Sequence, residues 1–278
     1  MDKLDRLGWA AGISFTSLGV RIGIRTNSKE LLGRVVAQLP AGWARSASST
    51  VRQLYSVIEG GTSRRPNVRA FHVLYANLDR LERTTNLEQL LASLESDIDA
   101  HIARSTRVRF FVHAGAVAWK GKAIILPGRT LSGKSTLVKE FLRAGAEYFS
   151  DEYAVLDANG SVHPFPRPLS LRRGRPEDGD RTRMTAAELG AKAAKYPLPV
   201  SLVVLARYKH GARWRPKVLS AGEGVLGLMA NTITAQSQPE KALATLEKTI
   251  RKAVVIAGNR GEAQEVVESI LNNMENQN

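Results

Sequence analysis

A glycine-rich segment in the middle of the chain has the composition and spacing of a phosphate-binding loop. Residues 128–135 read GRTLSGKS, which is Gly, four residues, Gly, Lys and Ser, the Walker A pattern. The glycines let backbone N–H groups converge on a phosphate, the lysine faces the β- and γ-phosphates, and the serine hydroxyl can ligate magnesium. The pattern predicts a site for ATP and Mg²⁺ formed by Gly128, Leu131, Ser132, Gly133, Lys134, Ser135 and Thr136.

The sequence on both sides of this loop provides the context that such a loop requires. The apolar run KAIIL, residues 122–126, predicts a buried strand before it, and STLVKEFLRAG, residues 135–145, predicts a helix after it. Thr136 is expected to open that helix, whose N-terminal dipole favours an anion, and Gly145 is expected to end it. A chance match to the pattern in a chain of this length is on the order of 1%. A glycine-rich turn without a ligand is the alternative.

Two adjacent acids follow the first strand after the loop. Asp151 and Glu152 lie in SDEYAVLD, at a strand end beside the predicted phosphate site. Asp151 is predicted to hold magnesium together with Ser135, and either acid could take a proton from an attacking hydroxyl as the catalytic base. A solvated strand end is the alternative. Asp157, in LDANG, is instead predicted to start a tight turn.

One histidine lies upstream of the loop. His113 is expected at the end of the strand RFFVHAG, one hairpin before the loop. Its residue type alone favours a structural role, since a single histidine at a strand end is more often structural than catalytic. The other histidines have no comparable context, and no cluster of His, Asp or Glu has the spacing of a dedicated zinc site.

In their order, the segments VHAGAV, ILPGRTLSGKSTL and RAGAEYFSDE resemble the kinase core of the HPr kinase/phosphorylase family. That family phosphorylates a serine on a protein and has a phosphate-loop fold related to phosphoenolpyruvate carboxykinase. The resemblance covers roughly residues 108–157 and implies that Lys134 and Ser135 hold nucleotide phosphates and magnesium. It also implies that Asp151 and Glu152 serve metal binding and general base catalysis, and that His113 lies near the transferred phosphate.

The resemblance is to a divergent member of the wider HPr-kinase-like set. Glu152 stands where the bifunctional enzymes have a second aspartate, and Ala114 separates His113 from the following glycine. The residues before Arg107 do not resemble the usual N-terminal domain of the family. Some proteins of the wider set phosphorylate serine in small peptides or free serine, and the resemblance implies acceptors of that kind rather than HPr itself.

An arginine-rich stretch follows these motifs. Residues 166–183 contain six arginines and three acids and are broken by prolines and glycines, which predicts a loop. The stretch could be a solvated surface, a clamp on triphosphate or a groove for an acidic substrate. Arg167 and Arg172 lie nearest the core strand. Arg207, at the end of the strand SLVVLARY, is a further candidate for stabilising the transferring phosphoryl group.

The elements that must position these residues form a mixed α/β fold. A boundary near residue 105 is predicted to divide the chain into an N-terminal α+β region, 1–105, and a P-loop nucleotide-binding domain, 106–278, with a hairpin turn at Lys120 and Gly121. The remaining elements are expected as strands at 19–27, 51–61, 68–79, 146–150, 153–157, 162–166 and 200–208 and as helices at 29–39, 86–103, 240–254 and 263–274.

Composition limits the classes of function. With 278 residues, 43% of them hydrophobic, the chain can bury a substantial core. It has no cysteine, which excludes disulfides and thiolate metal sites and favours a reducing compartment, the cytoplasm. The N-terminus does not have the pattern of a signal peptide, and no apolar run is long enough to predict a membrane span. The net charge of +14 attracts polyanions, but the basic residues are scattered, which speaks against nucleic acid as the partner.

These features predict an ATP- and Mg²⁺-dependent kinase that transfers the γ-phosphoryl group to a hydroxyl, with serine of a protein or peptide the favoured acceptor. A non-catalytic nucleotide-binding regulatory module is one alternative, and a P-loop ATPase acting on a polyanionic partner is another. The expected partners are a nucleotide and a protein, peptide or small hydroxyl acceptor. A homo-oligomer is left open.

Overall fold

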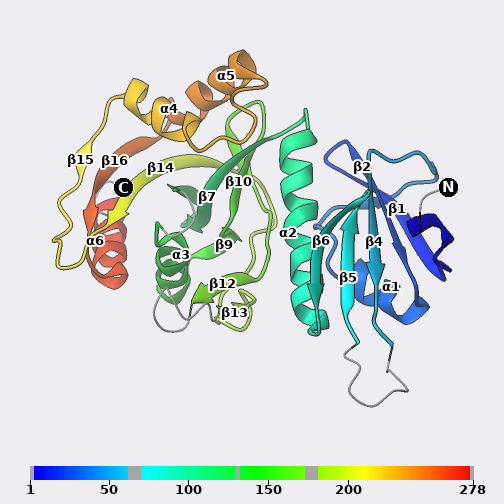
Figure 1. The fold of residues 1–278 in the computed structure, drawn as a ribbon. Coiled ribbons are helices and arrows are strands. Elements are labelled where there is room, and N and C mark those ends of the chain that lie inside the picture. Colours follow the sequence, from blue (N-terminus) through cyan, green and yellow to red (C-terminus); the bar gives the residue numbers. More distant parts are fainter. Residues whose placement is uncertain (1–2, 62–69, 129–131, 173–180, 276–278) are drawn as a thin grey trace. The chain divides into compact units, whose positions relative to one another are not determined.

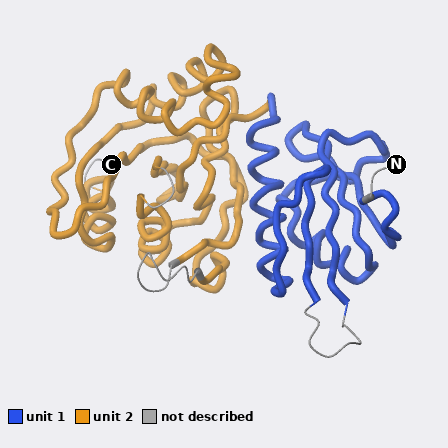
Figure 2. Tube along the Cα trace, in the orientation of Figure 1, with its two compact units in different colours: residues 1–107 blue, residues 108–278 orange. Residues whose placement is uncertain are grey.

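Two compact units make up the chain. A computed structural model describes residues 3–61, 70–128, 132–172 and 181–275. The chain divides into unit 1, residues 1–107, and unit 2, residues 108–278 (Figure 2). Each unit combines β-strands with helices, which confirms the prediction of a mixed α/β fold (Figure 1).

Unit 1 contains a six-stranded sheet in the order β3-β1-β2-β4-β5-β6, in which β2 and β4 run parallel and the other neighbours antiparallel. Helix α1 packs on β1 and β2, and α2 packs on β5 and β6. Alternate strand residues, such as Ile22, Tyr55 and Leu74, are fully buried, which is the pattern of a sheet with one covered face. The elements are η1 Lys3–Arg6, β1 Ala11–Ser17, β2 Val20–Thr26, α1 Lys29–Val36, β3 Ala44–Arg45, β4 Gln53–Ile58, β5 His72–Ala76, β6 Asp79–Thr84 and α2 Leu87–Ser105.

The two helices of unit 1 begin at capping side chains. Ser28 Oγ accepts a hydrogen bond from the N–H of Leu31 at 3.0 Å and caps α1. The side chain of Asn86 accepts from the N–H groups of Glu88 and Gln89 and caps α2. These bonds satisfy backbone donors that have no partner inside the helix and so fix where each helix starts.

Unit 2 is built on an eight-stranded sheet in the order β11-β10-β7-β8-β14-β16-β15, with β9 also paired to β7. Because β8, β14 and β16 run parallel, their carboxyl ends meet at one edge of the sheet. Strand β7 runs antiparallel to β8, β9 and β10. The elements are β7 Phe110–Trp119, β8 Lys122–Pro127, α3 Lys134–Arg143, β9 Glu147–Ser150, β10 Tyr153–Leu156, β11 Ser161–His163, β12 Leu169–Arg172, β13 Arg181–Met184, β14 Leu198–Tyr208, β15 Lys217–Val218, α4 Ala221–Met229, α5 Pro239–Ile250, β16 Val254–Arg260 and α6 Ala263–Glu275.

Helices cover both faces of the unit 2 sheet, with α3 and α6 on one face and α4 and α5 on the other (Figure 1). On β14, Leu202 and Val204 pack in the apolar cluster that contains α3 and α6, whereas Val203 packs in the cluster that contains α4 and α5. Central strands with two covered faces need apolar residues at successive positions, which explains the uninterrupted runs in β8 and β14.

The C-terminal region differs from its prediction. The helix expected over 240–254 ends at Ile250, and Val254 instead opens strand β16. A short apolar run after an amphipathic helix does not distinguish a strand from more helix. Parallel pairing of β16 with residues 202–208 of β14 makes it a strand of the main sheet.

The arginine-rich stretch also differs from its prediction as a loop. From Leu169 on, its described residues belong to the two-stranded sheet of β12 and β13, in which Ser170 is opposite Arg183. Residues 173–180, which contain two of its arginines, lie outside the described residues.

Among the described residues, no helix is both long enough and apolar enough to cross a membrane.

Candidate functional site

Strand β7 brings the histidine, the acid pair and the glycine-rich loop together. On one side of the strand, Tyr153 of β10 pairs with His113, and the N–H of Ala114 donates to the carbonyl of Glu152 at 3.2 Å. On the other side, the N–H of Gly128, where the loop begins, donates to the carbonyl of His113 at 3.1 Å. Three segments that are separate in sequence therefore meet at the middle of β7.

His113 lies inside β7, and the prediction that it ends a strand is wrong. The strand continues to Trp119 through a run of small residues. A Cβ on Gly115 would lie only 2.5 Å from Val138 Cγ2 of α3. The small residues after His113 therefore do not end the strand. They allow helix α3 to pack close to it.

The acid pair lies where the chain bends between β9 and β10. Buried Ser150 shapes this bend, because its Oγ accepts from the N–H of Glu152 at 3.3 Å and from the N–H of Tyr153 at 3.1 Å. The bend turns Asp151 toward the first turn of α3, where the Ser135 hydroxyl donates a hydrogen bond to its carboxylate. A side chain from the strand connection thus meets one from the predicted phosphate loop.

Helix α3 begins at the second glycine of the loop. Gly133 is its N-cap, with a left-handed φ of +84°, and the helix starts at Lys134. The prediction that Thr136 opens the helix is therefore wrong, and Thr136 is exposed in its first turn. The Gly133 carbonyl accepts from the N–H of Leu137 at 3.2 Å. Because that peptide is trans, the N–H of Lys134 points the opposite way, out of the helix N-terminus, as an anion requires.

The described parts of the loop are closely packed around its first glycine. A Cβ on Gly128 would lie 2.5 Å from Ser132 Oγ and 3.1 Å from Ser132 Cβ, so a larger residue here would require Ser132 to move. Ser132 Oγ is itself buried with no hydrogen-bond partner among the described residues. Leu131, predicted to bind the nucleotide, lies outside the described residues.

A buried arginine packs behind the loop, and the sequence does not predict it. Arg260, at the end of β16, is 2% exposed, and its Nη2 donates to the Gly133 carbonyl at 3.0 Å. Its Nη1 donates to the Gly261 carbonyl at 2.9 Å, and its guanidinium lies 5.1 Å from the centre of the Tyr208 ring. The guanidinium holds the Gly133 carbonyl on the far side of its peptide and adds a fixed positive charge beside the loop. Recognising β16 as a strand is what would have drawn attention to Arg260.

Asp151 has the most strongly perturbed carboxyl group of the site. It is 7% exposed, and burial raises its pKa to about 6. The hydrogen bond from Ser135 lowers the pKa, the charge of Glu152 raises it, and Lys134 and the N–H of Ser170 lower it further. Its Oδ1 is buried with no hydrogen-bond partner among the described residues. The carboxylate is therefore short of positive charge and of hydrogen-bond donors.

Lys134 and His113 complete a cluster of four ionisable groups. Lys134 is 9% exposed, and burial lowers its pKa against the opposing charges of Glu152 and Asp151. The Nδ1 of His113 lies 3.7 Å from the Glu152 Oε1. Burial lowers the pKa of His113. The negative charge of Glu152 raises this pKa, and the positive charge of Lys134 lowers it further. At neutral pH this histidine is therefore an uncharged group between a lysine and a carboxylate.

No protein-family model matches the chain, and no curated protein matches it.

The donor set fits magnesium better than a metal held by protein side chains alone. Within the described residues, no group of three or more His, Asp or Glu side chains could hold a metal ion. Magnesium, however, needs only one or two protein oxygens when phosphates and water provide the rest. Ser135 and the unpartnered carboxylate oxygen of Asp151 supply oxygens of that kind.

The structure does not bring Arg207 to this cluster. Its neighbours Leu205 and Ala206 pack with the α4–α5 and α3–α6 clusters respectively. Since side chains alternate along a strand, Arg207 lies on the α4–α5 face, opposite the face that carries α3, and it is exposed. Of the arginines favoured in the 166–183 stretch, Arg167 stacks over the Phe165 ring at 5.6 Å, and the side chain of Arg172 lies outside the described residues.

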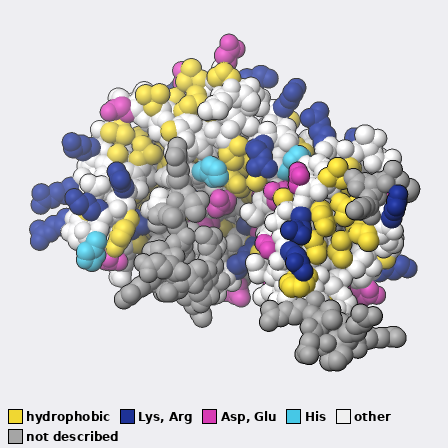
Figure 3. Space-filling model, in the orientation of Figure 1, with side chains coloured by type: hydrophobic (Ala, Val, Ile, Leu, Met, Phe, Trp, Pro, Cys, Tyr) yellow, Lys and Arg dark blue, Asp and Glu magenta, His cyan; other side chains and the backbone are white. Residues whose placement is uncertain are grey.

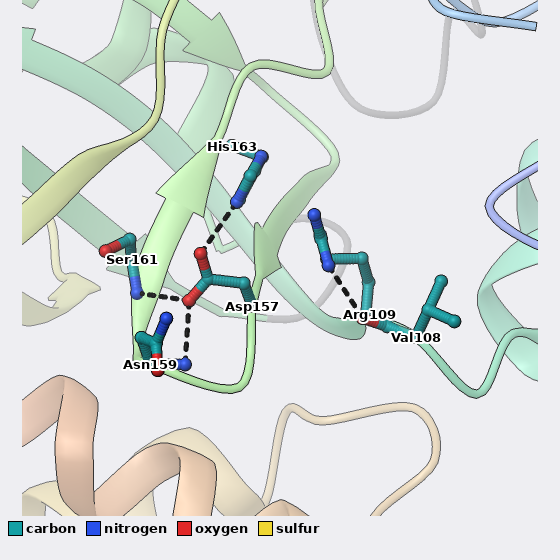
Figure 4. A network of polar contacts seen from close by, with 6 residues as sticks. All are labelled: Val108, Arg109, Asp157, Asn159, Ser161 and His163. Carbon is teal, nitrogen blue, oxygen red and sulfur yellow. Dashed lines mark hydrogen bonds and ion pairs between the residues drawn. The ribbon is translucent and has the colours of Figure 1, made fainter.

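Asp157 starts a tight turn, which confirms its prediction. Its Oδ1 accepts from the N–H groups of Asn159 at 2.9 Å and Ser161 at 3.1 Å, and its Oδ2 lies 2.8 Å from His163 Nε2 (Figure 4). Partial burial would raise its pKa, but the hydrogen bonds from His163, Ser161 and Asn159 together lower it. Asp157 and His163 therefore stabilise the β10–β11 hairpin.

Replacing Gly133 by alanine is expected to destabilise the protein by about 2–4 kcal/mol, because a Cβ there combines a left-handed φ with a collision against the Arg260 guanidinium. Gly211 is the matched control, since its φ is +70° and nothing lies within 4 Å of a Cβ built on it. Gly211→Ala should cost only about 1 kcal/mol. Urea denaturation of both variants measures the difference, and equal losses would show that Arg260 does not pack against the loop.

Proposed function

We propose that this protein is an ATP- and Mg²⁺-dependent kinase that transfers the γ-phosphoryl group to a hydroxyl, with serine of a protein or peptide as the favoured acceptor. The observation that supports it best is the meeting of Lys134, Ser135, Asp151 and Glu152 at the N-terminus of α3. A phosphate-binding lysine with a carboxylate pair one strand away is what transfer to a hydroxyl needs. The resemblance of residues 108–157 to HPr kinase points in the same direction.

The N-terminus of α3 and Lys134 bind the triphosphate in this proposal. The N–H of Lys134 points out of the helix, and its ammonium is buried beside two carboxylates. Arg260 keeps the Gly133 carbonyl away from the anion by donating a hydrogen bond to it on the opposite side of the peptide. Each of these groups is in place before the ligand arrives, so binding requires little reorganisation.

Ser135 and Asp151 would hold the magnesium ion. Bound there, the ion neutralises charge on the β- and γ-phosphates. Asp151 is suited to this role because it is buried, shares a hydrogen bond with Ser135 and has no partner for Oδ1 within the described part of the chain. Its raised pKa reflects burial, and a cation beside it would favour the ionised carboxylate.

Glu152 is the carboxylate that an incoming hydroxyl can reach. Its side chain is 55% exposed, whereas Asp151 is buried against Ser135. Glu152 would take the proton as the acceptor oxygen attacks the γ-phosphorus and the bond to the β-bridging oxygen breaks, leaving ADP. His113, whose Nδ1 lies 3.7 Å from Glu152, would help orient that carboxylate. The other assignment, with Asp151 as base, would leave Ser135 without its carboxylate partner.

The proposal is tested by incubating the protein with γ-labelled ATP and Mg²⁺ and a panel of serine-containing peptides. The expected result is one phosphoserine for each ATP consumed, with transfer lost when magnesium is removed by chelation. ATP binding without transfer to any hydroxyl would instead support a regulatory nucleotide-binding module. Release of labelled inorganic phosphate alone would support an ATPase.

Glu152→Gln is expected to lower the rate of transfer by about a hundredfold or more while ATP affinity changes little, because the amide cannot accept the proton. Glu147→Gln, at the exposed first position of β9, is the matched control and should leave the rate unchanged. Single-turnover kinetics separates the two quantities. A normal transfer rate in Glu152→Gln would move the role of base to Asp151.

A further inference from the structure

A cluster of unpaired cations lies at the outer edge of the unit 2 sheet. Five basic residues occur within residues 207–217, a segment that contains no Asp or Glu, and all five are exposed. In the described part of the chain, none of the five forms an ion pair with an acid. This group is called the basic edge, and it consists of Arg207, Lys209, Arg213, Arg215 and Lys217.

The basic edge lies at the same end of the sheet as the glycine-rich loop. It begins at the carboxyl end of β14, which runs parallel to β8, the strand that leads into the loop. It ends in β15, the outermost strand. Figure 3 shows Lys and Arg side chains gathered at this edge of unit 2, where Figure 1 places β15.

A short series of contacts connects the basic edge to the loop. The N–H of Lys209 donates to the Arg260 carbonyl at 2.9 Å. The Arg260 guanidinium lies 5.1 Å from the Tyr208 ring and donates to the carbonyl of Gly133. The basic edge is therefore connected through Arg260 to the back of the glycine-rich loop, and a ligand bound there would lie near the candidate site rather than at an unrelated surface.

The aromatic residues of the segment favour a peptide over a nucleic acid as the ligand. Tyr208 packs against Arg260, and Trp214 packs among the apolar residues under α6 and against Gly258. Proteins that bind single-stranded nucleic acid offer free aromatic faces on which bases stack. Here Trp214 is packed within the protein, and Tyr208, which is 47% exposed, lies over the Arg260 guanidinium, so the segment has no row of open rings for stacking. Its exposed cations suit carboxylates on an extended chain.

We propose that the basic edge binds an acid-rich segment of the acceptor polypeptide and so presents a nearby serine to the candidate site. The inference rests on the proposed kinase function, to which it adds a class of acceptor. Binding is electrostatic, so it should weaken as salt concentration rises. No bond is made or broken at the basic edge.

The experiment uses the full chain and a fluorescent peptide in which one serine is flanked by glutamates, with glutamine in place of glutamate as its neutral counterpart. Fluorescence anisotropy measures peptide affinity for wild type and for Arg213→Glu/Arg215→Glu. Lys241→Glu/Lys252→Glu is the matched control, because both lysines are exposed and the change in net charge is the same. ATP affinity of each variant is measured in parallel, and Arg213→Gln provides a milder change.

The expected result is tighter binding of the glutamate peptide than of the glutamine peptide, weakened about tenfold or more by the double arginine reversal. The lysine control should change this affinity much less, ATP affinity should be retained, and Arg213→Gln should have an intermediate effect. Equal losses in both double variants, or equal binding of the two peptides, would overturn the proposal. The proposal would also be overturned if a single-stranded RNA with the same net charge as the glutamate peptide bound more tightly than that peptide and lost affinity in the double arginine variant. Peptide binding without phosphoryl transfer would contradict the kinase function but not the docking role. Transfer at the same rate in wild type and in Arg213→Glu/Arg215→Glu would contradict the docking role but not the kinase function.

Discussion

Lys134→Ala is expected to reduce phosphoryl transfer by about a thousandfold or more, with a marked loss of ATP affinity. The lysine is 9% exposed at the start of α3 and lies within electrostatic range of both Asp151 and Glu152. Its removal takes away the charge that faces the phosphates and leaves two carboxylates to repel them. The lost positive charge and the uncompensated carboxylates both weaken the binding of a polyanion at this site.

Lys139→Ala is the matched control for this change, because Lys139 lies on the same helix and is less deeply buried. Calorimetric titration with ATP and a single-turnover transfer assay measure affinity and rate separately. Lys134→Met, which keeps the length of the side chain without its charge, tests whether a cavity rather than lost charge is responsible. Transfer at the wild-type rate in Lys134→Ala would show that the glycine-rich loop is not the catalytic site.

Asp151→Asn is expected to abolish transfer and, in the metal-free protein, to raise the free energy of unfolding by roughly 1–3 kcal/mol near pH 7. Burial raises the pKa of Asp151 to about 6, so at neutral pH the folded protein holds an ionised carboxylate that would be more stable in water. Asparagine removes that buried charge. Loss of activity together with a gain in stability is typical of a group kept for function.

The effect of Asp151 on stability also has a defined dependence on pH. With its pKa raised from 3.8 to about 6 by folding, Asp151 binds a proton more tightly in the folded state than in the unfolded state. Its contribution to stability therefore falls as pH rises from about 4 to about 6 and is constant above that range. The stability difference between Asp151→Asn and wild type should grow over this interval. A difference that is the same at pH 4 and pH 7 by urea denaturation would contradict the burial of this carboxylate.

Local sequence was sufficient to predict several turns and one helix end around the loop. Gly145 ends α3 in a left-handed conformation with φ of +97°, and Lys120 and Gly121 both have positive φ in the hairpin between β7 and β8. Asp157 starts its turn through bonds to backbone N–H groups close by in sequence. These features depend on neighbouring residues, so glycine and turn chemistry are enough to recognise them.

Features that depend on pairing between distant segments could not be predicted in the same way. Strand β16 follows an amphipathic helix without a turn signal, and it is a strand because it pairs with β14 and β15. Arg260 consequently resembles a surface arginine in sequence, although it is 2% exposed against the loop. Arg207 is the reverse case. Its place at a strand end suggests a catalytic role, but side-chain alternation along β14 places it on the α4–α5 face of the sheet, away from α3.

The meeting of His113 with Glu152 illustrates the same limit. The order of the motifs suggests that they share a site, but their approach depends on β9 and β10 pairing with one strand, β7, on either side of a bend. Ser150, which holds that bend through two backbone N–H groups, has no sequence signal of its own. The identity of the candidate residues was therefore accessible from sequence, and their geometry was not.

The most direct test is to incubate wild type and Asp151→Asn with γ-labelled ATP, Mg²⁺ and a mixture of serine peptides that includes the glutamate-flanked one, and to locate the label by mass spectrometry. Wild type is expected to place the label on a peptide serine, and Asp151→Asn is expected to leave the peptides unlabelled while remaining folded. Label found only as inorganic phosphate with wild type, or equal labelling of the peptides by the two proteins, would contradict a hydroxyl kinase that depends on this site.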